Sequence, residues 1–324
     1  MTTLKLLSAA FVCGILMMQT AADGWAQAYP TKPVRYMVPS SPGSSVDTIG
    51  RIVADGLTEA LGQQVIVENR AGAGGNIGAA LAAKAAPDGY TVVQVNNNHT
   101  TNVTLYKKRG YDLLRDFAPV TKLAVSPYVL VVHPSLPVKS VGDLITLAKA
   151  TPGAITYASA GVGSGTFMVT ELFKSQAKLD MLHIPYVGGG PALTAVMSGE
   201  ALLYGAPMAT ALPQIKAGRL RALGVSTETS MPLLPKVPPI TATVPDFEFS
   251  AWAGLMVPAG TPKEVVATLR AASLKALNSP RIDKRLSDLG FSVVVSQPEE
   301  LVTFMKTEIA KMAKLIRDNN IATR

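Results

Sequence analysis

The most constraining feature of this sequence is an apolar strand that runs through a glycine- and serine-rich turn into an amphipathic helix. The run 34–38 predicts the strand, and the turn 39–45 follows it. Apolar residues then recur at helical spacing from Val46 to Leu61, and Gly62 ends the helix. The first N–H groups of a helix lack partners, and its dipole is positive there. The turn therefore predicts an anion site, although a plain loop before a capped helix would give the same pattern.

A second version of this pattern lies in the middle of the chain. The strand 155–157 enters the glycine–serine turn 158–166, and a helix containing Met168, Leu172 and Phe173 follows. Two such units facing each other across a hinge would form a cleft lined by backbone N–H groups from both halves.

Strands and helices alternate through the first hundred residues. The strand 65–68 leads through a glycine turn at 69–76 into a helix, and a further strand follows at 90–95. This order indicates a mostly parallel sheet covered by helices, in which ligands bind beyond the carboxyl ends of the strands. The turn 39–45 and the polar cluster 96–102 both follow strands, so both are expected at that edge.

Two long apolar runs, 120–132 and 249–257, are interpreted as strands that cross between two domains. We therefore predict an α/β protein with two mostly parallel sheets joined by two crossing strands. The first domain comprises residues 27–126 and 250–324, and the second comprises residues 127–249. The ligand cleft is expected between them, with closure about the hinge.

The first 26 residues are predicted to be a secretory signal. Lys5 lies in a positive segment, 6–18 is apolar but too short to span a bilayer, and cleavage would follow Ala26 or Ala28. Cys13, the only cysteine, falls within this segment. A mature chain without thiols suits the bacterial periplasm, where we expect this protein.

Composition and motifs narrow the function classes. The net charge of +8 is spread along the chain and only 6% of residues are aromatic, which argues against nucleic-acid binding. The three histidines are not at ligand spacing, so no metal site is predicted. The segment 161–165 is not a nucleophile elbow because Ser164 comes one place late, and 72–78 misses a dinucleotide fingerprint by one residue. A binding protein without a cofactor is favoured; a secreted hydrolase or a degenerate nucleotide-binding enzyme is the alternative.

The candidate ligand-binding residues come from the two turns, the polar cluster and the later strand ends. They are Ser40, Ser41, Gly43, Ser44, Ser45, Asp47, Asn97, His99, Ser159, Ala160, Gly163, Ser164, Thr166, Phe167, Tyr186, Gly188 and Ala206. Several have a structural alternative. Asp47 could orient the first turn or be a plain charge at a helix start, and His99 could face the cleft or be a hydrogen-bonded structural histidine. Phe167 and Tyr186 could belong to the core.

Motifs along the whole mature chain resemble those of the substrate-binding proteins of tripartite tricarboxylate transporters, also called the Bug family. The similar segments are 29–34, 67–78, 86–91, 116–120, 157–159, 183–186, 217–223 and 258–262. The resemblance implies a two-domain periplasmic-binding-protein fold, similar to type II, that closes on a small carboxylate. It implies that backbone N–H groups, hydroxyls and ordered waters of the two turns hold the carboxylate. It also implies delivery to integral membrane subunits of a transporter, and no catalysis. We expect a monomer.

The sequence departs from the family pattern around the expected cleft. Residues 40–47 read Ser-Ser-Pro-Gly-Ser-Ser-Val-Asp where the family usually reads like F-P-P-G-G-G-T-D. Residues 159–167 read Ser-Ala-Gly-Val-Gly-Ser-Gly-Thr-Phe where it usually reads like S-S-G-N-G-S-S-G-H. Val187 stands at a common lysine, and 205–207 stand at a common F-D-N stretch.

These departures lead to an expectation about the ligand. Apolar residues occupy usually polar positions at Val162, Phe167, Val187 and Ala206. A distal charge buried against them would be poorly paired, so we expect one carboxylate on a larger apolar or aromatic body. The alternative is that these residues face the core and that an ordinary dicarboxylate is held by Ser40, Ser44, Ser45 and Asn97.

Overall fold

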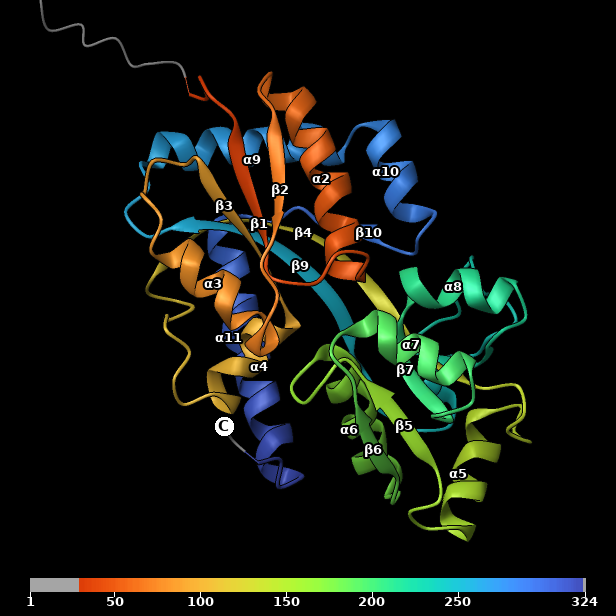
Figure 1. The fold of residues 1–324 in the computed structure, drawn as a ribbon. Helices are drawn as coiled ribbons and strands as arrows, with labels where there is room; N and C mark the ends of the chain where they lie inside the picture. Colours follow the sequence, from red (N-terminus) through yellow and green to blue (C-terminus); the bar gives the residue numbers. More distant parts are fainter. Residues whose placement is uncertain (1–28, 323–324) are drawn as a thin grey trace, which may run out of the picture. The chain divides into compact units, whose positions relative to one another are not determined.

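The protein is described by a computed structural model that covers residues 29–322 (Figure 1). The predicted signal sequence, with Cys13, lies outside the described residues. Within the described residues, the helices and strands lie between Val34 and Asp318.

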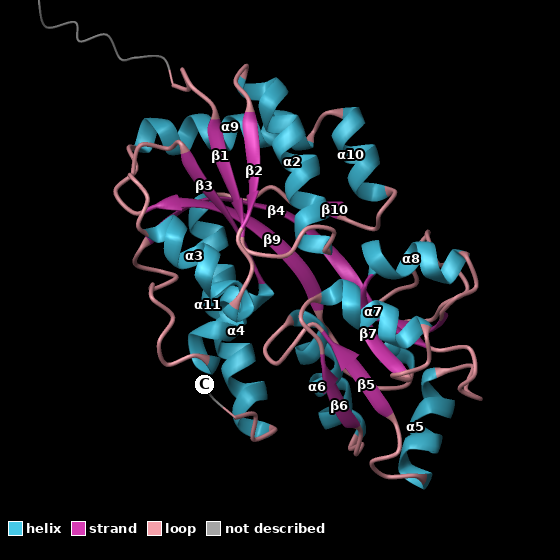
Figure 2. Ribbon diagram, viewed as in Figure 1, coloured by secondary structure: helices cyan, strands magenta, loops and turns pink. Residues whose placement is uncertain are grey.

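Strands and helices alternate as predicted over most of the chain (Figure 2). The strands are β1 (Val34–Val38), β2 (Val65–Asn69), β3 (Thr91–Asn96), β4 (Phe117–Val132), β5 (Thr156–Ser159), β6 (Leu182–Pro185), β7 (Leu203–Pro207), β8 (Arg221–Val225), β9 (Ser250–Pro258) and β10 (Ser292–Val293). The α-helices are α2 (Ser45–Leu61), α3 (Asn76–Ala83), α4 (Asn97–Leu105), α5 (Val141–Ala150), α6 (Gly165–Ala177), α7 (Gly189–Met197), α8 (Met208–Lys216), α9 (Lys263–Leu277), α10 (Pro280–Ser287) and α11 (Pro298–Asp318). Short 3₁₀ helices in the described residues are η2 (Ala73–Gly75) and η3 (Ile240–Ala242).

The strands pair in the order β2-β1-β3-β9-β4-β7-β5-β6, and β8 and β10 also pair with β4. Parallel pairs form around β1, with β2 and β3, and around β5, with β6 and β7. The pairs that involve β4 and β9 are antiparallel. Each group of parallel strands therefore has the βαβ arrangement that the sequence predicts. The antiparallel strands β9 and β4 lie between the two groups.

Strand β4 connects the two groups of strands. Its first part pairs with β9 as far as Pro127 opposite Ser250, and its second part pairs with β7 from Tyr128 opposite Pro207 onward. Strand β9 begins at Ser250 and pairs with β3 and β4 only. The run 120–132 is thus one strand that serves both groups, whereas the second connection passes through the residues just before β9.

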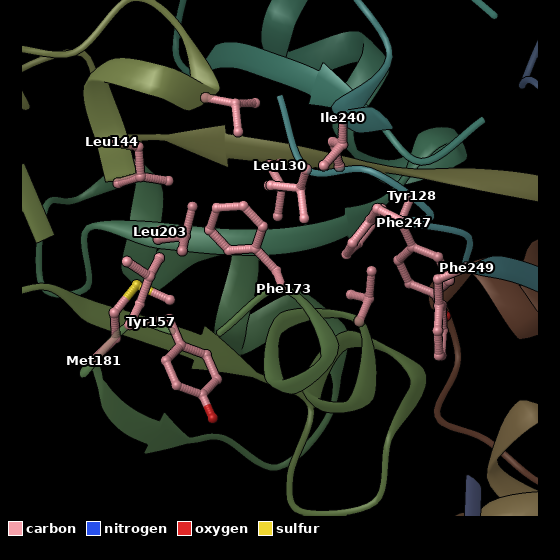
Figure 3. Packing of buried hydrophobic residues seen from close by; sticks show 14 of the residues in the cluster. Tyr128, Leu130, Leu144, Tyr157, Phe173, Met181, Leu203, Ile240, Phe247 and Phe249 are labelled. Atoms are coloured by element: carbon pink, nitrogen blue, oxygen red, sulfur yellow. The ribbon is translucent and has the colours of Figure 1, made fainter. Parts of the chain in front are cut away.

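Each group of strands has a buried core of its own. The first core contains Met37, Val93, Val95, Trp252 and Met256. The second contains aromatic side chains from β4, β5, α6 and the segment before β9: Tyr128, Tyr157, Phe173, Phe247 and Phe249 (Figure 3). Phe173 packs edge-on against Phe247, with ring centroids 6.3 Å apart.

The last helix, α11, packs against both cores. Its first half places Leu301 and Met305 in the first core. Its second half places Met312, Leu315 and Ile316 in the second. The apolar face predicted for this helix is therefore divided between the two halves of the fold.

The polar cluster at 96–102 forms the helix α4, which the sequence analysis did not predict. Asn96 is the N-cap: its Oδ1 accepts a hydrogen bond from Asn98 N, and its own N–H donates to His99 Nδ1 at 3.1 Å. The residues of this helix are mostly polar and buried, so hydrophobic periodicity could not reveal it.

Candidate functional site

A cavity of about 220 Å³ lies where the carboxyl ends of six strands meet. It is lined by residues that follow β1, β2, β3, β5, β6 and β7, together with Tyr128 and Tyr204. The lining is Pro39, Ser40, Ser41, Ser44, Ser45, Val46, Ala71, Gly72, Ala73, Gly74, Gly75, Asn98, Tyr128, Ala160, Ser164, Gly165, Thr166, Val187, Gly188, Gly189, Tyr204, Pro207 and Thr210. Among the described residues, no aspartate, glutamate, lysine, arginine or histidine lines this cavity.

Five α-helices of the described residues begin at the cavity wall: α2, α6, α7, α8 and α4. Ser44 and Ser164 cap the first two, and each hydroxyl accepts one backbone N–H from the first turn. The starts of α7 and α8 have no side-chain cap. Gly188, before α7, has φ +101°, a conformation that L side chains rarely adopt. Free N–H groups and positive dipole ends thus give this wall an electropositive character that favours an anion.

Asp47 braces the first turn instead of facing the cavity. Its buried carboxylate accepts hydrogen bonds from Gly43 N and Asn69 Nδ2, both at 2.8 Å, and from Arg51 Nε at 3.0 Å. Burial by itself raises the pKa of Asp47, but the bonds from Arg51, Gly43 and Asn69 outweigh it and lower the pKa below its usual value. Of the two roles considered for Asp47, the structure supports the one that orients the turn.

The second turn is held by its own hydroxyls. Ser159 Oγ lies 2.7 Å from His183 Nε2 and accepts a hydrogen bond from Gly161 N at 3.0 Å. Thr166 Oγ1 accepts a hydrogen bond from Ala160 N at 2.9 Å. These bonds fix the backbone between β5 and α6, so the N–H groups at the start of α6 are held in place.

The predicted site residues separate into two sets. Those that line the cavity are Ser40, Ser41, Ser44, Ser45, Ala160, Ser164, Thr166 and Gly188. Those that do not line it are Gly43, Asp47, Asn97, His99, Ser159, Gly163, Phe167, Tyr186 and Ala206. Ligand contact remains a prediction for the first set.

The polar members of the second set serve the framework. Asn97 fastens α4 to β9, because its Nδ2 donates to Ser250 O and its Oδ1 accepts from Trp252 N. His99 is fully buried in the cap of α4. Both residues follow β3 closely. Their side chains bond or pack within the framework, and neither residue lines the cavity.

Other members of that set are placed by packing or by local bonds. Gly43 is exposed and donates to Asp47, and Gly163 lies against Leu105, where an added Cβ would come within 2.2 Å of the leucine side chain. The Tyr186 hydroxyl donates to Glu200 at 2.8 Å.

Four apolar residues led to the expectation of an apolar ligand body, and most of them lie outside the ligand cavity. Ala206 is fully buried in a core cluster. Val162 and Phe167 line a separate cavity of about 330 Å³. Val187 lines the ligand cavity but is 93% exposed. The premise of an apolar wall was therefore wrong at three of these positions.

Several lining residues were missed. Tyr128 and Tyr204 lie in apolar strands, where sequence cannot distinguish a core tyrosine from one whose hydroxyl reaches a cavity. Burial raises the pKa of both above its usual range, so both hydroxyls stay neutral. Asn98 lies in the predicted polar cluster, and its position after β3 was the available indication.

Buried His99 predicts a pH-dependent stability. Burial lowers the pKa of His99 to about 4, whereas an unfolded histidine titrates near 6.5. Between these values the unfolded chain binds more protons, so the free energy of unfolding should hold above pH 6.5 and fall as pH drops toward 4. The expected loss is about 3 kcal/mol. Denaturant unfolding at pH 7 and 4.5 would measure this loss. The variant His99→Asn should show a flatter pH dependence of the free energy of unfolding. An equally steep loss in that variant would contradict the assignment of the effect to His99.

Comparison with known proteins places this geometry in a family. Residues 49–321 match the model of the tripartite tricarboxylate transporter family receptor. The chain belongs to this family. It is 36% identical over 310 residues to the UPF0065 protein in the tcbD-tcbE intergenic region of Pseudomonas sp. strain P51, covering 94% of this chain and 92% of that protein. It is 34% identical to Protein BugT of Bordetella pertussis, covering 92% of each.

Solved structures share the fold. A protein from R. palustris, Rpa4515 with adipate, matches with a TM-score of 0.88 and 34% identity, over 91% of this chain and 100% of that one. MatC of Rhodopseudomonas palustris with bound malate matches with a TM-score of 0.83 and 31% identity, over 89% of this chain and 100% of that one. The predicted two-domain periplasmic-binding-protein fold is confirmed. Because the family and these structures are substrate-binding proteins, the receptor is a binding protein and not an enzyme.

No group of three or more His, Cys, Asp or Glu side chains within 29–322 could hold a metal ion. No helix in that range combines the length and apolarity that crossing a membrane requires.

Proposed function

We propose that this receptor binds a small organic carboxylate in the cavity at the starts of α2, α6, α7 and α8. The observation that carries the proposal is a lining that offers hydroxyls, an amide and glycine backbone but no charged side chain among the described residues. Backbone N–H groups and hydroxyls can hold a carboxylate through charge-assisted hydrogen bonds without an arginine. The carboxylates named with two relatives, adipate and malate, support the same ligand class.

The dimensions favour a small ligand. A volume of about 220 Å³ is below the range of roughly 300–1,000 Å³ typical of sites for drug-sized ligands. With Val162, Phe167 and Ala206 outside the lining, little supports a large aromatic body. A compact aliphatic mono- or dicarboxylate fits better than the aromatic acid expected from the sequence.

The remaining parts of the function are proposed by analogy with the family. The receptor would be exported through the signal sequence at 1–26, act as a monomer in the periplasm and deliver its ligand to the integral membrane subunits of the transporter. Loss of uptake of the ligand on deletion of those subunits would be expected.

We further propose that residues 27–126 with 250–324 and residues 127–249 move as two domains that close on the ligand. The cavity draws its lining from both parts. Ligand contacts made only in the closed form would drive closure.

Calorimetry tests the proposed ligand class. The probes are adipate, L-malate and benzoate, with 1,4-diaminobutane as a cation of similar length. We expect at least one aliphatic acid to bind and the diamine to give no heat. At one hundred times its Kd, the acid should stabilise the protein by about 2.7 kcal/mol. Small-angle scattering of the same samples should show a smaller radius of gyration. Binding of the diamine alone, or turnover of an acid, would contradict the proposal.

A further inference from the structure

Tyr128 lies where the ligand cavity adjoins a smaller chamber. The side chain is 4% exposed, and its ring packs edge-on against Phe249 with centroids 5.4 Å apart. Tyr128 lines the ligand cavity and also a neighbouring chamber of about 50 Å³. No group among residues 29–322 hydrogen-bonds this hydroxyl.

The side chain of Asn98 lines the same two cavities as Tyr128. Its Oδ1 accepts a hydrogen bond from Gly165 N, at the start of α6, at 3.2 Å. This bond assigns the oxygen and leaves the Nδ2 amino group, with two donors, free of protein partners within the described range. Asn98 thus offers neutral N–H donors at the place where Tyr128 offers an O–H.

Gly165 is the neighbour that makes room for the Tyr128 hydroxyl. A Cβ at Gly165 would lie 2.0 Å from the hydroxyl oxygen. The glycine is the first residue of a helix and has no positive φ, so its conformation would accept alanine, which is favoured in helices. Glycine is required here because any Cβ would collide with the phenol oxygen of Tyr128.

A purely structural role accounts poorly for this arrangement. Buried polar groups are normally hydrogen-bonded, and phenylalanine would pack against Phe249 equally well. A phenol and an amide with free donors at one junction are suited to a ligand group that only accepts hydrogen bonds.

We propose that the Tyr128 hydroxyl and the Asn98 amino group together donate to one carboxylate of the bound ligand and select for it. This inference rests on the proposed function and adds the residues that recognise the anion. Both donors are neutral, so they would discriminate by hydrogen-bond direction: an ammonium group in place of the carboxylate would set its N–H donors against those of Asn98.

Calorimetry of Tyr128→Phe with adipate and L-malate tests the proposal. Loss of one hydrogen bond to a charged group should weaken the better of the two probes by about ten- to a hundredfold, with an unchanged melting temperature. Tyr36→Phe is the matched control, because it removes a buried hydroxyl that donates to Gln94 outside the ligand cavity. The control should bind within about twofold of the wild type.

A second variant approaches the same contact from the other side. Gly165→Ala would displace the Tyr128 hydroxyl, and we expect a loss at least as large as in Tyr128→Phe. Adding Tyr128→Phe to Gly165→Ala should then cost little more, because the contact is already gone. Wild-type affinity in Tyr128→Phe for a probe that the wild type binds would overturn this inference alone. If the wild type binds neither acid, the proposed ligand class fails and the inference fails with it.

Discussion

Replacing Asn98 with aspartate is expected to weaken the binding of an aliphatic carboxylate by about a thousandfold. The two side chains have nearly the same shape, and the aspartate could still accept the hydrogen bond from Gly165 N. The new charge, however, would face the ligand across a cavity whose lining, within the described residues, holds no cation. Two like charges about 4 Å apart repel by roughly 4 kcal/mol at an effective dielectric of about 20, or about three decades of affinity.

The control for this experiment is Asn278→Asp. Asn278 is exposed at the end of α9, so the variant changes the net charge equally without touching the cavity. Calorimetry with adipate or L-malate, whichever the wild type binds more tightly, should show affinity within about twofold of the wild type for this control. Retention of affinity in Asn98→Asp to within tenfold would show that the carboxylate binds away from the start of α6.

Replacing Asp47 with alanine is expected to lower the free energy of unfolding by about 3 kcal/mol at pH 7. The variant leaves the Gly43 N–H and the part-buried Asn69 Nδ2 without their charged acceptor, and hydrogen bonds to a charged group contribute about 1.5–3 kcal/mol each. The Arg51 side chain is half exposed, so its ion pair with Asp47 adds little to the free energy of unfolding. Because hydrogen bonds lower the folded pKa of Asp47, this stability is present above the unfolded pKa near 3.9 and is lost as pH falls through the folded value.

Urea unfolding of wild type and Asp47→Ala at pH 7 and pH 3 would measure this effect. The difference between the two proteins should be large at pH 7 and smaller at pH 3. Asp55→Ala is the matched control: Asp55 pairs with Arg281 and Arg285 but is 48% exposed, so its loss should cost under about 1 kcal/mol. Equal destabilisation by the two variants would refute the bracing role of Asp47.

The fold was predictable because its strands and most helices follow hydrophobic periodicity. The first turn carries its own indications: Gly62 ends α2, as the sequence predicts, and a serine, Ser44, caps its start. Helix α4 lacks such a pattern, since its stability comes from a cap and from buried polar contacts such as those of Asn97. Short α10 was also missed.

The site was predictable only as far as the turns reveal it. The serines beside Gly43 lie at the cavity because a strand end and a helix start fix their place. Which side chain then faces inward depends on contacts between distant segments, such as Asn97 with Trp252 or Asn98 with Gly165. Tyr128 reaches the cavity through its own length, which no local pattern encodes.

The position of α11 has a consequence for how the receptor measures its ligand. A single rigid helix is anchored in one core by Leu301 and Met305 and in the other by Met312 and Ile316. A large swing of one half would strip apolar surface from one of these anchors, at roughly 25 cal/mol per Å². Small sliding movements are cheaper, so α11 limits how far the two proposed domains can open before a ligand arrives and close after it binds. Less conformational freedom is then lost when a ligand binds. Acids of the wrong chain length also cannot be accommodated by a different degree of closure. We therefore expect helix α11 to limit the range of ligand lengths that the cavity accepts.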